Sequence, residues 1–176
     1  MQKIRNEELN RLTPDEFRKA EKTPLVIVLD NVRSMNNVGS VFRTADAFLC
    51  ESIILCGLTP VPPHREIHKT ALGATETVEW LYAEHTLSAV QTLQQKGYKV
   101  YAIEQVHGSM MLDKFQPLTE DKIALVFGNE VEGVQQDVVD ACNGCIEIPQ
   151  LGMKHSLNIA VSAGIVIWDV FNKLKS

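Results

Sequence analysis

The chain has 176 residues, of which 45% are hydrophobic, and carries a formal net charge of −5 at pH 7. This length supports one compact domain with a sizeable core and is short for two. The longest apolar run is interrupted by Asn158, Ser162 and Asp169, and the charged N-terminus has no apolar signal core, which argues against membrane-spanning and secreted proteins. We therefore expect a cytoplasmic protein with reduced thiols.

Residues 1–23 are predicted to form a short helical extension before the main domain. In the segment "LTPDEF", Thr13 can act as the N-cap, Pro14 takes the first helical position and Glu16 the third, which makes a capping box. This helix should end before Pro24, where the main domain, residues 24–176, begins.

Apolar strands and helices alternate through that domain. Apolar runs of strand length occur at residues 24–31, 52–57, 98–104, 123–128 and 145–149. Helical patterns occur at 38–49, 88–96 (with Gly97 as C-cap) and 134–142, a last helix runs from Ser156 to the end, and residues 60–77 resemble a proline-led loop. Strands that are buried on both faces and alternate with helices predict an α/β fold, a mostly parallel sheet with helices on both faces.

The strand at 123–128 runs into a loop, "GNEVEGV", that carries two acids, Glu130 and Glu132. The loop has the glycine spacing of a P-loop, but Val134 stands where the phosphate-binding lysine is required. The loop after the first strand also lacks the G-x-G-x-x-G pattern of a dinucleotide site. Because carboxylates repel phosphate and favour positive charge, the acidic loop indicates a cationic or neutral nucleoside ligand.

Polar residues also follow the first strand. In "NNVGSVFR", Asn36 or Asn37 can cap the helix, and Arg43 lies one turn further along, facing the pocket or the sheet edge. An ordinary ion pair of Arg43 with Asp46 or Asp30 is the alternative.

The segment after the last strand completes this polar edge. Pro149 ends the strand, Gly152 bends the loop, and Ser156 caps a helix whose first turn carries Asn158. The helix itself, residues 156–175, is apolar on most sides, which is more than core packing needs and indicates a dimer face.

Three segments, in order and spacing, resemble the motifs of the SpoU/TrmH family in the SPOUT superfamily of RNA methyltransferases: "NNVGSVFRTADAF", "ALVFGNEVEGV" and "IEIPQLGMKHSLNIAVSAGIVIWD". The resemblance implies an α/β fold with a deep C-terminal trefoil knot, which breaks the usual rule against threaded chains. It also implies a homodimer that needs no metal and that uses S-adenosylmethionine to methylate a ribose 2′-hydroxyl of tRNA or rRNA.

The resemblance assigns catalytic roles to Arg43, Asn37, Glu130, Ser156 and Asn158. Arg43 would lower the pKa of the hydroxyl or bind a phosphate that takes the proton, because a guanidinium stays protonated and is a poor base. Asn37 would hold the geometry, and Glu130 would orient Arg43 or other polar groups of the site. Ser156 and Asn158 would lie near the reacting centre.

The cofactor, on the same resemblance, lies between the second and third motifs. Backbone amides and carbonyls would read the adenine there, and glycines would allow the loop to bend. The implied cofactor-binding residues are Leu125, Val126, Phe127, Gly128, Asn129, Gly133, Ile148, Pro149, Leu151, Gly152, Met153, Ser156, Leu157 and Asn158.

The chain is acidic overall, but its basic side chains are clustered in a few segments. Dimerisation would gather these clusters into one groove that contacts RNA. The residues expected to bind RNA are Arg33, Arg65, His68, Lys69, Lys154 and His155. Without a large separate RNA-reading domain, substrate choice would depend on the N-terminal segment and residues 58–76, which weakly favours tRNA over rRNA.

Other interpretations stay open. Cys142 and Cys145 have the spacing of a zinc or redox pair, but no second pair accompanies them, and His64 and His68 lack the rest of a metal motif. The chain could also bind RNA or S-adenosylmethionine on this fold without methyl transfer, or be an unrelated nucleotide-binding enzyme.

Overall fold

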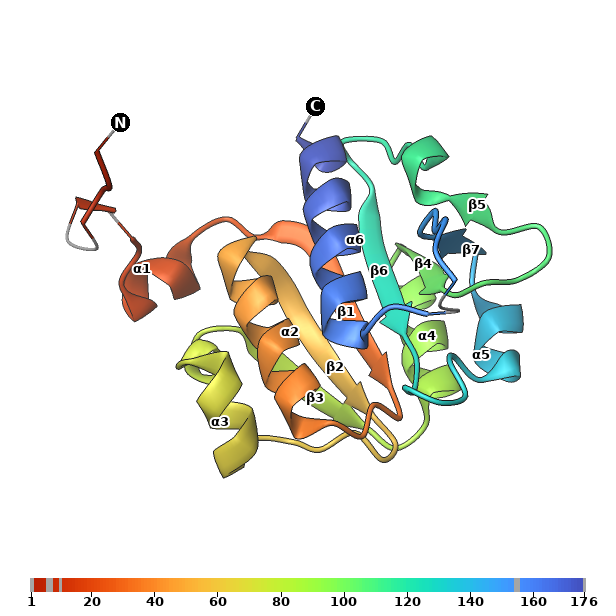
Figure 1. The fold of residues 1–176 in the computed structure, drawn as a ribbon, viewed down its shortest axis with the longest axis horizontal. Coiled ribbons are helices and arrows are strands. Elements are labelled where there is room, and N and C mark those ends of the chain that lie inside the picture. The colour runs from red at the N-terminus through yellow and green to blue at the C-terminus, as the bar shows by residue number, and fades with distance from the viewer. Residues whose placement is uncertain (1, 6–7, 10, 154–155, 176) are drawn as a thin grey trace.

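The computed structural model describes residues 2–5, 8–9, 11–153 and 156–175. Lys154 and His155, two of the predicted RNA contacts, lie outside them. Within the described residues, seven strands form one sheet in the order β3-β2-β1-β6-β4-β7-β5, and all neighbouring pairs are parallel (Figure 1). They are β1 (Thr23–Asp30), β2 (Cys50–Cys56), β3 (Glu79–Ala83), β4 (Tyr98–Ile103), β5 (Met110–Met111), β6 (Lys122–Phe127) and β7 (Gly144–Glu147).

Helices cover both faces of this sheet. They are α1 (Pro14–Lys19), α2 (Met35–Ala47), α3 (Arg65–Ala71), α4 (Thr86–Gln95), α5 (Gln136–Ala141) and α6 (Ile159–Leu174). In β1, Ile27 belongs to the core shared with α2, α3 and α6, whereas Val28 belongs to the core shared with α4 and α5. Both side chains are fully buried. Truncating one such residue to alanine typically costs about 1.5–5 kcal/mol. The predicted parallel α/β fold is therefore confirmed.

The predictions that were made from a cap residue, Thr13 at the start of α1 and Gly97 at the end of α4, were correct. Thr13 and Glu16 form the expected capping box, with Glu16 N donating to Thr13 Oγ1 at 3.3 Å and Thr13 N to Glu16 Oε2 at 2.8 Å. Gly97 follows the C-cap of α4. No helix within the described ranges is long and apolar enough to cross a membrane.

Two predicted helix caps were wrong. Ser34 caps α2, because its Oγ accepts from Asn37 N at 3.3 Å, and the two asparagines at 36 and 37 lie inside the first turn. Asn158, not Ser156, caps α6, because its Oδ1 accepts from the backbone amides of Ala160 and Val161. Ser156 lies outside that helix, and β7 ends at Glu147, two residues before the predicted stop at Pro149.

The predicted loop at 60–77 contains a helix, α3. His64 Nδ1 accepts from Glu66 N at 3.2 Å and caps it, and Ile67 and Ala71 are buried against the core. Strands β3 and β5 were missed. In β3 the apolar run is short, Trp80 to Ala83, and its side chains are exposed or half-buried at the edge of the sheet, and β5 has two residues.

Candidate active site

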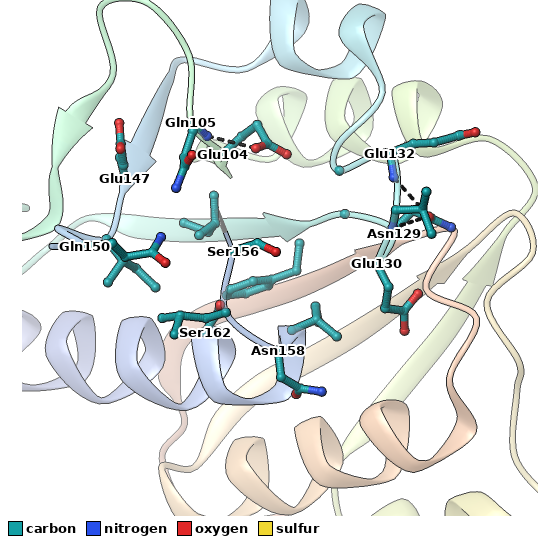
Figure 2. A pocket seen from close by; sticks show the side chains of 18 of the residues that line it. Glu104, Gln105, Asn129, Glu130, Glu132, Glu147, Gln150, Ser156, Asn158 and Ser162 are labelled. Carbon is teal, nitrogen blue, oxygen red and sulfur yellow. Dashed lines mark hydrogen bonds between the residues drawn. The ribbon is translucent and has the colours of Figure 1, made fainter. Parts of the chain in front are cut away.

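A cavity of about 450 Å³ opens where β4, β6 and β7 reach their carboxyl ends. Its wall combines the end of β4, the loop 128–134, the residues from β7 to Gln150, and the segment 156–162 that enters α6 (Figure 2). Polar side chains from all four parts face this region in Figure 2. The carboxyl edge of a parallel sheet is the usual place for a ligand in α/β proteins.

The loop 128–134 is held closed by its own backbone. Asn129 N donates to Gly133 O at 2.9 Å and Gly133 N donates to Asn129 O at 3.0 Å. The Asn129 side chain is buried, donates to Asn31 O at 2.9 Å and accepts from Val131 N at 2.8 Å. A Cβ on Gly128 would lie 2.1 Å from the Gly133 carbonyl carbon, so the turn requires a residue without a side chain there.

Glu130 leaves this loop and reaches the segment before α2. Its carboxylate accepts from Arg33 N, Ser34 N and Asn37 Nδ2, each at 3.1 Å. Burial alone would raise the pKa of Glu130, but the hydrogen bonds from these donors outweigh it and lower the pKa. Glu130 is therefore an anion held in place by the first motif, not a mobile acid.

Asn37 and Asn158 extend this contact into the third motif. Asn158 Nδ2 donates to Asn37 Oδ1 at 3.2 Å. The orientation of both amides follows from their partners: Asn158 Oδ1 accepts from the amides of α6, and the Glu130 carboxylate can only accept from Asn37. One hydrogen-bonded chain thus joins the three motifs.

Arg43 stands apart from this chain. It is exposed on α2 and does not line the cavity, and no hydrogen bond or ion pair of its side chain occurs among the described residues. Neither alternative ion pair is made: the Asp46 carboxylate accepts from Thr77, and buried Asp30 accepts from Thr86 Oγ1 at 2.6 Å. Glu130 contacts Asn37 and backbone amides rather than Arg43.

Most residues expected around the cofactor line the cavity. They are Phe127, Gly128, Asn129, Gly133, Ile148, Ser156, Leu157 and Asn158. Leu125 and Val126 do not, because both are fully buried in the middle of β6. Pro149, Leu151, Gly152 and Met153 are exposed and lie outside the lining.

Among the residues of the wall that the sequence analysis did not assign to the site are Glu104, Gln105 and Glu147. Glu104 and Gln105 follow β4, and Glu147 ends β7, where Ser109 Oγ donates to its Oε2 at 2.7 Å. With Glu130 and Glu132, the cavity has four carboxylates in its lining, which favours a ligand with positive charge. The sequence signal that could have found Glu104 is its place as the first polar residue after the apolar run of β4.

The four basic residues expected to contact RNA that the structure describes are exposed. Arg65, His68 and Lys69 lie on α3, and Arg33 lies between β1 and α2. Lys69 is 3.8 Å from Glu66, and such an exposed pair contributes little to stability.

The cysteine pair gives no sign of a metal. Among the residues that the structure describes, no group of three possible ligands of the His, Cys, Asp or Glu type occurs. Burial raises the pKa of Cys142 to about 12, so this thiol stays protonated at neutral pH.

Known proteins are similar to this chain over most of its length. The model of the SpoU rRNA Methylase family matches residues 24–168. A 23S rRNA (guanosine-2′-O-)-methyltransferase, RlmB, from Vibrio parahaemolyticus is 30% identical over 164 residues, which are 92% of this chain and 64% of that protein. The chain therefore spans less than two thirds of the length of this relative.

Solved structures share the fold. An AdoMet-bound rRNA methyltransferase from Sinorhizobium meliloti matches with a TM-score of 0.80 and 28% identity, over 94% of this chain and 62% of that one. A TrmH/SpoU tRNA modifying enzyme from A. aeolicus matches with a TM-score of 0.79 and 22% identity, over 90% and 79% of the two chains.

Proposed function

Because the chain belongs to the SpoU rRNA methylase family, we propose that it transfers a methyl group from S-adenosylmethionine to a ribose 2′-hydroxyl of RNA. The observation that carries this proposal is the hydrogen-bonded chain from Glu130 through Asn37 to Asn158, which ties all three motifs together beside one cavity. The relative from Vibrio parahaemolyticus and the structure from Sinorhizobium meliloti both bear the name of an rRNA methyltransferase.

The cavity fits S-adenosylmethionine in size and charge. Its volume of about 450 Å³ lies in the range of small-molecule sites. Four carboxylates suit the sulfonium and ammonium groups of this cofactor, and among the described residues no lysine or arginine lines the cavity to oppose them. Backbone groups of Phe127, Gly128, Ile148 and Leu157 would hold the adenosine. The cofactor supplies a methyl group that its sulfonium has already activated.

The protein must then place the hydroxyl and make it more nucleophilic. The exposed Arg43 guanidinium has no partner among the described residues, so it is free to meet RNA. It would stabilise the developing alkoxide, or bind the phosphate next to it that accepts the proton. Asn37, fixed by Glu130, would hold the ribose, and Ser156 lies on the cavity wall near the same place.

The larger assembly follows from the same family. We infer a trefoil knot made by the chain of the second and third motifs, in a single catalytic domain of residues 24–176 preceded by a helical extension of residues 1–23. We also infer a homodimer, for which α6 offers an exposed apolar surface: Val161 is 51% exposed, Ile165 39% and Trp168 57%. Its place of action would be the cytoplasm, with tRNA or rRNA as substrate.

RNA would approach over the basic residues Arg33, Arg65, His68 and Lys69. Three of them, Arg65, His68 and Lys69, are on α3, which packs directly against α2, the helix that carries Arg43. Lys154 and His155 are proposed RNA contacts from the sequence alone.

Methyl transfer from labelled S-adenosylmethionine tests this function directly. Unmodified tRNA and unmodified rRNA are offered separately, and the labelled nucleoside is identified after nuclease digestion. Label in a 2′-O-methyl nucleoside is expected. Label on a base would contradict the proposed chemistry, and cofactor binding without any transfer would favour the binding-only alternative.

A further inference from the structure

We propose that Glu104, the first residue after β4, is a positioning residue that fixes the loop 128–134 around the cofactor cavity. Its Oε2 accepts from Val134 N at 3.0 Å, and its Oε1 accepts from Gln105 N at 2.9 Å. Figure 2 shows the side chain extending from the end of β4 towards the side of the cavity that this loop forms. One carboxylate therefore joins two separate parts of the cavity wall.

The loop is shaped to admit this carboxylate. Gly133 has φ +71°, and a Cβ at this position would lie 2.1 Å from Glu104 Oε2. The left-handed backbone favours glycine here, and a side chain at this position would also have to displace the Glu104 carboxylate. Because the contact falls on Gly133 and Val134, Glu104 fixes the end of the turn that begins at Asn129.

The acid of the second motif lies inside that turn. Glu130 stands between Asn129 and Gly133, whose backbones bond to each other, and its reach to the amides of Arg33 and Ser34 depends on the shape of the turn. Loss of the Glu104 contact should therefore loosen the cavity wall first and the contact to α2 second. Glu104 lies in none of the three motifs, and its assignment to the cofactor depends on the proposed function.

Asp121 provides a matched control. Its Oδ2 accepts from Leu118 N at 3.0 Å, so it also uses a carboxylate to hold a backbone amide of a loop, and its Oδ1 pairs with Lys99 Nζ at 2.7 Å. It precedes β6, at the amino edge of the sheet, away from the cavity at the carboxyl edge. An effect that arises from any loosened loop would appear in both variants, whereas an effect on the cofactor should follow Glu104 alone.

The first measurement needs no cofactor. Amide hydrogen exchange of residues 128–134 is compared in the wild type, Glu104→Ala, Glu104→Gln and Asp121→Ala. Loss of a hydrogen bond to a charged group should speed exchange in Glu104→Ala by about ten-fold or more. Glutamine offers one acceptor oxygen, so Glu104→Gln should lie between the wild type and alanine. Asp121→Ala should leave this loop unchanged.

The second measurement is the affinity for S-adenosylmethionine by titration calorimetry, with the KM for RNA alongside. We expect the Kd of the cofactor to rise about ten-fold in Glu104→Ala and less in Glu104→Gln, with little change in the KM for RNA. Unchanged exchange in both Glu104 variants would overturn the positioning role. Faster exchange with an unchanged Kd would overturn the link to the cofactor. A wild type that binds no cofactor would reject the proposed function, while the exchange data would still decide the role of Glu104.

Discussion

Asn37 Nδ2 donates to Glu130 Oε1 at 3.1 Å, across 93 positions of the chain. The contact joins the first turn of α2 to the loop after β6, and it exists because β1 and β6 are parallel neighbours whose carboxyl ends meet. Glu130 therefore holds the Asn37 side chain and the backbone amides of Arg33 and Ser34 in place.

Replacing Glu130 by glutamine should lower both stability and transfer. Because hydrogen bonding depresses the folded-state pKa of Glu130, its ionised form stabilises the fold above the unfolded value near 4.5. That contribution is lost as the pH falls through the lower folded value. The melting temperature of Glu130→Gln should lie below that of the wild type at pH 7 and approach it in acid. A gap between the two proteins that widens on acidification would contradict this assignment.

Replacing Arg43 by alanine should reduce methyl transfer by about 100-fold or more, since it removes the group that stabilises developing charge. The cofactor affinity should stay within a few-fold, because Arg43 does not line the cavity. Arg43→Lys keeps the charge but not the planar fork and should recover part of the rate. Single-turnover rates measure the loss of methyl transfer, and calorimetry measures the affinity for the cofactor. A near-normal rate in Arg43→Ala would show that another group carries out this step.

Substitutions of Asn158 separate helix capping from site geometry. Asn158→Ala removes the N-cap of α6 and should cost about 1 kcal/mol of stability. Asn158→Asp keeps an oxygen for the amides of Ala160 and Val161 but cannot donate to Asn37 Oδ1. We expect aspartate to restore the melting temperature and not the rate. Recovery of both would mean that Asn158 acts only as a cap.

Charge reversal on α3 tests the RNA surface. Arg65→Glu combined with Lys69→Glu should weaken RNA binding and flatten its dependence on salt, because phosphate contacts release counterions. Lys96→Glu combined with Lys122→Glu, after α4 and at the start of β6 on the amino edge of the sheet, changes the net charge by the same amount; this matched control should leave RNA affinity unchanged. The affinity of each variant for RNA, measured at several salt concentrations, tests this prediction. Equal effects of both changes would indicate attraction by net charge alone.

A charge on α6 tests the dimer. Trp168→Glu places a carboxylate on the exposed apolar surface of this helix and should convert the dimer to a monomer by light scattering after size exclusion. Leu58→Glu is the control, since Leu58 is 68% exposed and lies far along the chain from α6. A wild type that is already a monomer would reject the inferred assembly.

Residues with a strong local signal could be assigned from the sequence. Strands β1, β2 and β6 were found because burial on both faces leaves a continuous apolar run, and Thr13 was found because a cap acts on its own neighbours. β3 was missed because its apolar run, Trp80 to Ala83, is short, and such a run cannot be assigned to a strand by periodicity alone. The caps of α2 and α6 were predicted at neighbouring residues rather than at Ser34 and Asn158, because several polar residues stand at the start of each helix.

The site needed more than local signals. The motifs named Asn37, Glu130 and Asn158, but their contacts span 93 and 121 positions and depend on the strand order, which no periodicity encodes. Glu104 carries no motif at all, and its role became visible only when β4 was found beside β6.

The bond between Asn158 and Asn37 links the start of the last helix to the start of the second. A nascent chain on the ribosome therefore cannot assemble its site until α6 has emerged, even though most of the sheet has already been synthesised. Contacts of such long range also slow folding, because distant segments must meet before they stabilise each other. The order of synthesis thus keeps the growing polypeptide inactive until its last helix is in place.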